Sequence, residues 1–211
     1  MRLNLPIWRK NRTFAAMKNI VFDLGGVVFA RDPRKCSPEF LRFFEFVRYA
    51  EMPQFWNEYD RGALTYNQVR DAVAAYRSAS VELTDRYLHQ AIDLQEAIVP
   101  TERLIGELKA AGYRLYVLSN MSREFIAFLR RLPVYRNFDG EVVSCEESVI
   151  KPEAEIYRRL LTRYNLDPAE TLFIDDRQAN LDAAALQGIH TQLFDFHDPE
   201  GSCDRIRRRL Q

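Results

Sequence analysis

The feature that narrows the choice of fold most is the segment Ile20–Val28, in which an apolar run stops at Asp23 and two glycines follow. An apolar run of strand length that is bounded by glycine is typical of a parallel strand covered on both faces. Ligands of parallel sheets bind beyond the carboxyl ends of the strands. Asp23 is therefore a candidate functional residue, although an Asp close to a glycine also occurs in plain turns.

The chain after residue 100 alternates between helical and strand patterns, and Gly112 and Gly188 can each end a helix. The expected helices cover 100–111, 124–132, 152–164 and 179–187, and the expected strands cover 113–118, 140–144, 171–174 and 191–194. Pro152 is expected at the first position of its helix. This alternation predicts an α/β fold, a parallel sheet with helices on both faces.

The segment 33–99 has a different pattern, with no strand alternation and with apolar residues such as Phe40 and Phe44 at helical spacing. Within it, Gly62 can end one helix and Thr65 can begin the next. The chain thus divides into an N-terminal extension (1–17), a core made of 18–32 and 100–211, and a helical insertion (33–99).

Charge and cysteine content exclude several classes of partner. The 211 residues carry 30 Lys plus Arg and 30 Asp plus Glu, so no net field favours nucleic acid or a membrane surface. The three cysteines lack CxxC spacing, which favours a reducing compartment over a structural zinc site. The first sixteen residues lack the apolar core of a signal peptide, and Met17 is an alternative start. We expect a cytoplasmic monomer or homodimer with a small-molecule partner.

Polar side chains follow several of the expected strands. They are Asp23, Ser119, Asn120, Asp175 and Asp176. Right-handed crossovers bring the carboxyl ends of these strands to one edge of the sheet, so the five side chains could share a cleft. Three carboxylates in one place repel each other unless a cation joins them, and oxygen ligands suit Mg²⁺. Lys151 could supply further balancing charge.

Four motifs in order resemble those of the haloacid dehalogenase superfamily, most closely its helical-cap (subclass IA) members that act on sugar phosphates, such as glucose-1-phosphate phosphatases. The motifs are Phe22–Gly26, Leu118–Asn120, Ile150–Pro152 and Phe173–Asp176 with Asn180. The resemblance spans roughly residues 18–194. It implies a Rossmann-like sheet with an inserted α-helical cap, and a Mg²⁺-dependent hydrolase of small phosphorylated metabolites.

The resemblance also implies a role for each matching residue. Asp23 would be the nucleophile that forms an aspartyl phosphate. Ser119 and Asn120, the latter through its backbone amide, would bind the phosphoryl oxygens. Lys151 would neutralise charge on them and orient Asp23.

The implied metal site draws on the same strand ends. Asp176 would bind Mg²⁺ directly and Asp175 directly or through water, together with Asp23 and the carbonyl of Gly25. Asn180 would lie behind these ligands. In the insertion, Tyr59 and Arg61 lie in a turn that faces substrate in relatives, and Arg61 could bind a second anionic group.

The sequence departs from the family pattern at Gly25, where most phosphatases carry a second Asp that protonates the leaving oxygen. Proton transfer by a placed side chain contributes typically about 10²–10⁴ in rate. Water or a residue of the insertion could donate the proton instead.

Three alternatives stay open on the sequence. A non-catalytic module could bind a phosphorylated ligand or a partner without turnover. A dehalogenase also uses a nucleophilic Asp, but it carries an aromatic residue at the position of Gly25 and needs no metal, whereas Asp175 and Asp176 are retained here. A phosphomutase would need an acid at position 25.

Overall fold

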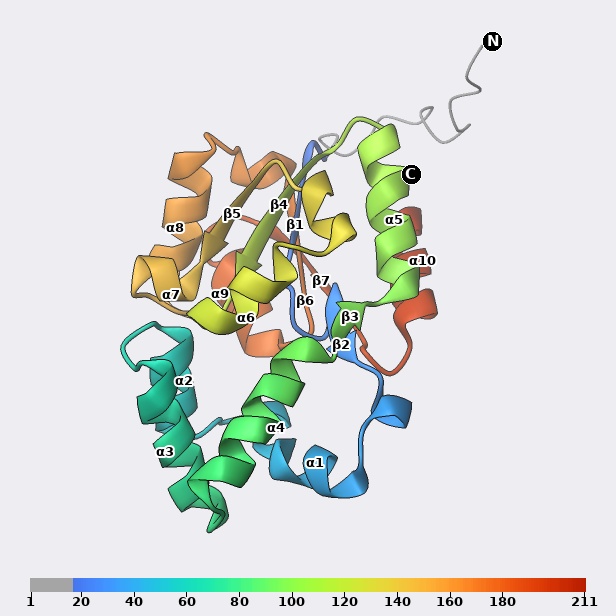
Figure 1. Ribbon diagram of the computed structural model, residues 1–211. Coiled ribbons are helices and arrows are strands. Elements are labelled where there is room, and N and C mark those ends of the chain that lie inside the picture. Colours follow the sequence, from blue (N-terminus) through green and yellow to red (C-terminus); the bar gives the residue numbers. More distant parts are fainter. Residues whose placement is uncertain (1–16) are drawn as a thin grey trace.

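A five-stranded parallel sheet forms the centre of the molecule (Figure 1). The computed structural model describes residues 17–211, so the expected extension lies, apart from Met17, outside the described residues. The strand order is β5–β4–β1–β6–β7. The strands are β1 (Asn19–Phe22), β4 (Arg114–Ser119), β5 (Gly140–Val143), β6 (Thr171–Asp175) and β7 (His190–Leu193). This confirms the predicted α/β class.

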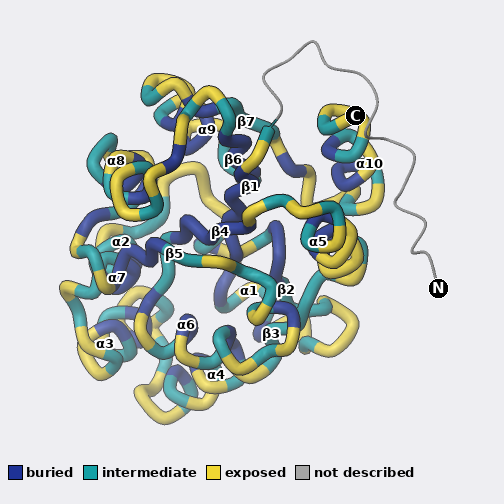
Figure 2. The backbone as a smooth tube through the Cα atoms, turned by 90° about the horizontal axis from the view of Figure 1, so that it is seen from above, coloured by how far each residue is buried: buried dark blue, intermediate teal, exposed yellow. Residues whose placement is uncertain are grey.

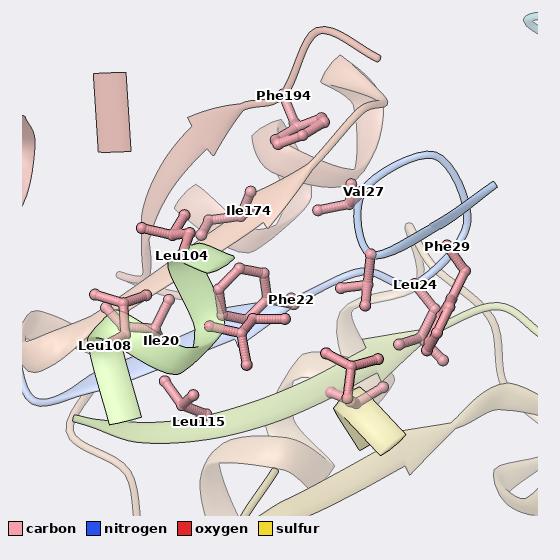
Figure 3. Packing of buried hydrophobic residues seen from close by; sticks show 14 of the residues in the cluster. Ile20, Phe22, Leu24, Val27, Phe29, Leu104, Leu108, Leu115, Ile174 and Phe194 are labelled. Atoms are coloured by element: carbon pink, nitrogen blue, oxygen red, sulfur yellow. The ribbon is translucent and has the colours of Figure 1, made fainter. Parts of the chain in front are cut away.

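The central strand β1 explains why its sequence is apolar without alternation. It pairs with β4 on one side and with β6 on the other. Ile20 and Phe22 face one hydrophobic cluster and Val21 faces the other, and all three are fully buried. Figure 3 shows Phe22 among Leu104, Leu115 and neighbouring side chains of the first cluster. Both faces of β1 are covered, so its side chains are apolar except for Asn19, whose Nδ2 donates to Thr171 Oγ1 at 3.1 Å.

Helices cover both faces of the sheet. The first cluster contains buried residues of α5 (Val99–Ala110), α6 (Arg123–Leu129) and α10 (Pro199–Leu210), and the second contains those of α8 (Ala154–Arg163) and α9 (Gln178–Ala185). Figure 2 shows β1 and β4 in dark blue at the centre and the exposed positions on the surrounding helices, whereas the edge strand β7 has no buried residue. None of the described helices has the length and apolar character needed to cross a membrane.

A helical insertion (33–93) lies beside the ends of the central strands (Figure 1). Along the chain it follows the short strand β2 (Phe29–Arg31) and precedes the short strand β3 (Gln95–Ala97). Its α-helices are α1 (Pro38–Phe43), α2 (Gln54–Asp60), α3 (Tyr66–Arg77) and α4 (Val81–Asp93). Short 3₁₀ turns at Pro33–Lys35 and Glu45–Arg48 complete it. Its aromatic residues form a hydrophobic cluster of their own, which also takes in Phe125 of α6. The capping box of Thr65 with Gln68 and the left-handed Gly62 confirm the predicted turn between α2 and α3.

The structure corrects the sequence prediction in three places. The segment 33–99 contains a strand, β3 (Gln95–Ala97), which pairs antiparallel with β2 (Phe29–Arg31). Three residues are too few to show an alternation, which is why both strands were missed. The helix expected from Pro152 begins at Ala154 instead, after a Lys151–Pro152 peptide bond that is cis. The helix expected over 124–132 ends at Leu129.

Candidate active site

Asp23 is the first residue after β1, and its side chain is held by several donors. Its backbone N–H donates to the carbonyl of Ile174 at 2.9 Å, which continues the pairing with β6. Its Oδ1 accepts hydrogen bonds from the N–H of Leu24 at 2.7 Å and from Ser119 Oγ at 2.8 Å, and Lys151 Nζ lies 2.9 Å away. No donor among the described residues reaches Oδ2. One oxygen is therefore fixed, and the other is left to react.

Lys151 joins the ends of three strands through its ammonium group. Its Nζ donates to the carbonyl of Leu118 at 3.0 Å and to Asp175 Oδ2 at 2.7 Å, in addition to the contact with Asp23. The side chain is 1% exposed. Burial alone would lower the pKa of Lys151, but the charges of Asp175 and Asp23 outweigh burial and raise it above its usual value. Lys151 is therefore a charged group in the site.

Asn120 uses its side chain to hold Lys151 in place. Its Nδ2 donates to the carbonyl of Lys151 at 2.9 Å, and its Oδ1 accepts from the N–H of Lys151 at 2.7 Å. The side-chain amide of Asn120 is therefore occupied by the backbone of Lys151. Phosphate binding by the backbone N–H of Asn120 stays a prediction. Ser119 is fully buried and lies beside Asp23, as expected.

Asp175 is the last residue of β6 and is surrounded by donors. Besides Lys151, it accepts from the N–H of Arg177 at 2.8 Å and from Asn180 Nδ2 at 3.0 Å. Tyr157 in turn donates to the carbonyl of Asn180 at 2.9 Å. Burial raises the pKa of Asp175, and the charge of Lys151 opposes this rise. Asn180 therefore supports the carboxylate from behind, where the resemblance placed it.

Three carboxylates meet at the ends of β1 and β6. Asp23, Asp175 and Asp176 each offer an oxygen within 4.8 Å of the other two. Burial, reinforced by the charges of Asp23 and Asp175, raises the pKa of Asp176 to about 7. Lys151 balances only part of this negative charge. The all-oxygen donor set and the remaining charge fit Mg²⁺, which these three residues could hold.

The two glycines after Asp23 have opposite environments. A Cβ built on Gly25 meets only Met121 Cε, 4.0 Å away, and Gly25 is exposed. A Cβ on Gly26 would lie 2.7 Å from Asp176 Oδ2, and Gly26 has a φ of +78°. Gly26 is therefore required by backbone geometry, whereas the space above Gly25 is open. Residue 25, being a glycine, contributes no carboxylate to that space.

The insertion contacts the core beside this site. Arg61 Nη1 donates to Glu153 Oε2 at 3.1 Å and to the carbonyl of Ser148 at 3.3 Å. Its guanidinium thus joins the insertion to the loop before α8. Binding of a second anionic group by Arg61 stays a prediction. The ring of Tyr59 is buried and its hydroxyl donates to Glu124 Oε2 at 2.6 Å. Both residues of the predicted turn therefore hold the insertion to the core.

Sequence reasoning missed Asp60 and Arg177. Asp60 is only 7% exposed, and Arg177 Nη2 donates to the carbonyl of Val47 in the insertion at 2.8 Å. Burial raises the pKa of Asp60 well above its usual range; the charge of Arg177 opposes this rise and that of Asp23 adds to it. The available signal was the position of Asp60 between Tyr59 and Arg61, but an acid in a turn is usually solvated.

Comparison with known families decides the relationship. A family model for a haloacid dehalogenase-like hydrolase matches residues 17–188, which include all four motifs. The chain belongs to the haloacid dehalogenase-like hydrolase family. The match includes the first segment of the core, the helical insertion and the second segment of the core as far as residue 188, before β7. Membership confirms the family to which the motifs pointed.

Relatives within this haloacid dehalogenase-like family include phosphatases. A sesquiterpene phosphatase of Aspergillus oryzae is 27% identical over 82% of this chain and 87% of its own length. A D-ribitol-5-phosphate phosphatase of Bacteroides thetaiotaomicron is 27% identical over 89% of this chain and 94% of its own length. A family enzyme from Bacteroides thetaiotaomicron, crystallised with magnesium and inorganic phosphate, is 25% identical with a TM-score of 0.66. That structure covers 85% of this chain and 94% of its own.

Proposed function

We propose that the chain is a Mg²⁺-dependent phosphatase of small phosphate monoesters that works through an aspartyl phosphate on Asp23. The observation that carries the proposal is the Asp23 carboxylate, with Oδ1 held by Ser119 and Lys151 and with no donor to Oδ2 from residues 17–211. The phosphatases among the relatives support this reading. The uncatalysed reaction is so slow that the site must lower the barrier by on the order of 20 kcal/mol.

Each residue of the site has a separate role in the proposed reaction. The free Oδ2 of Asp23 attacks phosphorus, while Ser119 and Lys151 hold the other oxygen and fix the angle of attack. Lys151 also places a buried positive charge beside the phosphoryl oxygens, where charge develops. A Mg²⁺ held by Asp23, Asp175, Asp176 and the carbonyl of Gly25 would supply further charge stabilisation on the phosphoryl group. Water then cleaves the aspartyl phosphate.

The substrate class is proposed from the same relatives. The leading candidates are sugar and polyol phosphates, including the hexose 1-phosphate to which the motifs pointed. The sesquiterpene phosphatase adds prenyl monophosphates to the panel. The helical insertion would act as a cap that closes over the substrate and excludes water. Cytoplasmic location and a monomeric or dimeric state stay predictions.

The test is phosphate release from this panel with and without Mg²⁺. We expect activity only with Mg²⁺ and its complete loss in Asp23→Asn, because the amide is not a nucleophile. Asp71→Asn, an exposed acid on α3, is the matched control and should keep full activity. Equal rates for Asp23→Asn and wild type would contradict the mechanism. Halide release from a 2-haloacid without metal would favour the dehalogenase alternative.

A second candidate function is suggested by the missing acid at Gly25. The chain could bind a phosphorylated ligand without turning it over. Beryllium fluoride mimics a phosphoryl group on a carboxylate, and with Mg²⁺ it should bind at Asp23 in either case. Tight Mg²⁺-dependent trapping with no turnover on the whole panel would favour the binding module over the phosphatase.

A further inference from the structure

The phosphatase mechanism needs a proton donor, and position 25 supplies none. In the described part of the chain, Met121 Cε is the one atom outside the neighbouring residues that lies within 4 Å of a Cβ built on Gly25. A side chain that protonates the leaving oxygen in place of water must therefore come from another element. The insertion reaches the residue that bounds the space above Gly25 through Ser144, whose Oγ accepts from the N–H of Met121 at 2.9 Å and donates to the carbonyl of Asp60.

Asp60 is the carboxylic acid that the insertion brings to the site. It is the last residue of α2 and is 7% exposed. Its backbone carbonyl accepts a hydrogen bond from the buried Ser144 Oγ, and the following turn packs so closely that a Cβ on Gly62 would meet the carbonyl of Cys145 at 2.5 Å. These contacts fix the main chain of Asp60 against the connection that follows β5.

The groups that act electrostatically on the Asp60 carboxyl, or donate a hydrogen bond to it, lie in the connections after several strands of the sheet. They are Asp23 after β1, the backbone of Ser122 before α6, Lys151 before α8 and Arg177 after β6. Cys145 of α7 (Ser144–Glu147) and Tyr59 of its own helix also sense its charge. No side chain among the described residues forms a hydrogen bond or ion pair with its carboxyl group. Its carboxyl instead accepts a hydrogen bond from the backbone N–H of Ser122, two residues beyond Asn120. Asp60 therefore lies beside the predicted phosphate-binding loop without pairing with a reacting side chain.

The other acids near the site already have a partner or belong to the carboxylate cluster. Glu124 accepts from the hydroxyl of Tyr59, and Glu153 pairs with Arg61. Asp175 and Asp176 belong to the carboxylate cluster with Asp23. Asp60 lies outside that cluster and is left as the acid that can hold a proton for the substrate.

We propose that Asp60 is the general acid and base of the reaction, supplied by the insertion in place of an acid at position 25. This inference rests on the proposed phosphatase function. When Asp23 attacks, the bond from phosphorus to the ester oxygen breaks, and protonated Asp60 gives its proton to that oxygen, releasing the alcohol. The Asp60 carboxylate then takes a proton from water as the water oxygen bonds to phosphorus. The bond from phosphorus to Asp23 breaks, which restores the Asp23 carboxylate and protonated Asp60 and releases phosphate.

The position fits a carboxyl group that keeps its proton until it is needed. Burial raises the pKa of Asp60, and the nearby charge of Asp23 raises it further, although Arg177 and Lys151 oppose the rise. A group with a raised pKa is an effective donor near neutral pH.

The test compares two leaving groups in Asp60→Asn. Alkyl phosphates need a proton on the departing oxygen and p-nitrophenyl phosphate does not. We expect Asp60→Asn to lose about 10²-fold or more in kcat on the best alkyl substrate of the panel. With p-nitrophenyl phosphate it should give a stoichiometric burst of p-nitrophenol followed by slow turnover, because phosphorylation of Asp23 proceeds and only the water step lacks its base.

Rescue separates catalysis from a structural role. Gly25→Asp combined with Asp60→Asn should restore alkyl phosphate hydrolysis, because the space above position 25 accepts a side chain. Asp93→Asn is the matched control, since Asp93 is an exposed acid that ends α4 as Asp60 ends α2. Asp60→Ala replaces Asp60→Asn if the latter does not fold, as judged by circular dichroism.

The outcomes distinguish this inference from the proposed function. Equal loss on alkyl and aryl substrates with no burst and no rescue overturns the role of Asp60, as does a wild-type rate on both. In either case, loss of all turnover in Asp23→Asn would leave the phosphatase mechanism standing. Turnover that survives Asp23→Asn overturns the phosphatase mechanism itself, and the assignment of Asp60 fails with it.

Discussion

At the scale of single residues, the site depends on how four charged side chains share one buried space. Lys151 contacts both Asp23 and Asp175, and Asp176 lies close to both acids without an ion pair among the described residues. Desolvation favours the neutral form of any acid that lacks a partner. Asp176 is therefore the member of the cluster that responds most directly to pH.

Mg²⁺ binding should depend on the ionisation of Asp176. Its pKa is raised to about 7 in the metal-free protein, so the carboxyl is mostly protonated at pH 6 and mostly ionised at pH 8. Because a cation binds the ionised form, we expect Mg²⁺ affinity to be about tenfold weaker at pH 6 than at pH 8. The free energy of unfolding of the metal-free protein has the opposite pH dependence. It falls as pH rises toward and through about 7, because the folded state holds the proton of Asp176 more tightly than the unfolded chain does. Titration calorimetry at the two values checks this, and equal affinities would contradict it.

At the scale of elements, the turn between α2 and α3 decides how the insertion meets the core. Arg61 and Tyr59 make side-chain contacts with the core, and Asp60 lies between them. Gly62 allows the close approach, because its φ of +79° and its contact with Cys145 leave no room for a side chain. The close approach at Gly62 therefore positions the three preceding side chains, those of Tyr59, Asp60 and Arg61, against the core.

Gly62→Ala should disturb both the stability and the site. The left-handed backbone costs a residue with a Cβ roughly 1–2 kcal/mol. The new Cβ would also lie 2.5 Å from the carbonyl of Cys145, so the turn must shift. We expect a loss of more than about 1 kcal/mol in urea unfolding, together with reduced turnover. Gly106→Ala, at an exposed position of α5, is the control, because a Cβ there meets nothing within 4 Å. Unchanged turnover in Gly62→Ala would show that this turn does not position Asp60.

At the scale of the whole molecule, β1 holds the two layers of helices together and carries Asp23. Phe22 is fully buried in the first cluster and its ring contacts Phe138 edge-on. Phe22→Ala should lower the free energy of unfolding by about 3–5 kcal/mol, because a large cavity remains in a packed core. Such a loss is a large share of the stability of an ordinary domain. Urea denaturation followed by circular dichroism measures it, and a loss below about 1 kcal/mol would show that the core closes over the cavity.

The sequence predicted most elements of the core within a few residues. Local patterns suffice there, because an apolar run such as 20–22 or an alternation of helix and strand signals depends on neighbouring residues only. The short strands Phe29–Arg31 and Gln95–Ala97 were missed, since each is stabilised by the other and carries no pattern of its own. The start of α8 at Ala154 was missed because Pro152 is equally compatible with the turn before a helix.

The sequence by itself determined the fold class and the family, because motifs in a fixed order need only the residue types and their spacing. It also predicted that polar side chains such as Asp23, Ser119 and Asp175 meet at one sheet edge, since parallel strands end on the same side, with Lys151 as a possible balancing charge. Only the tertiary structure decided that Asn120 holds Lys151, that Arg61 pairs with Glu153 and that Asp60 is buried beside the site. These partnerships depend on how loops and the insertion pack in space, and no local pattern encodes that packing.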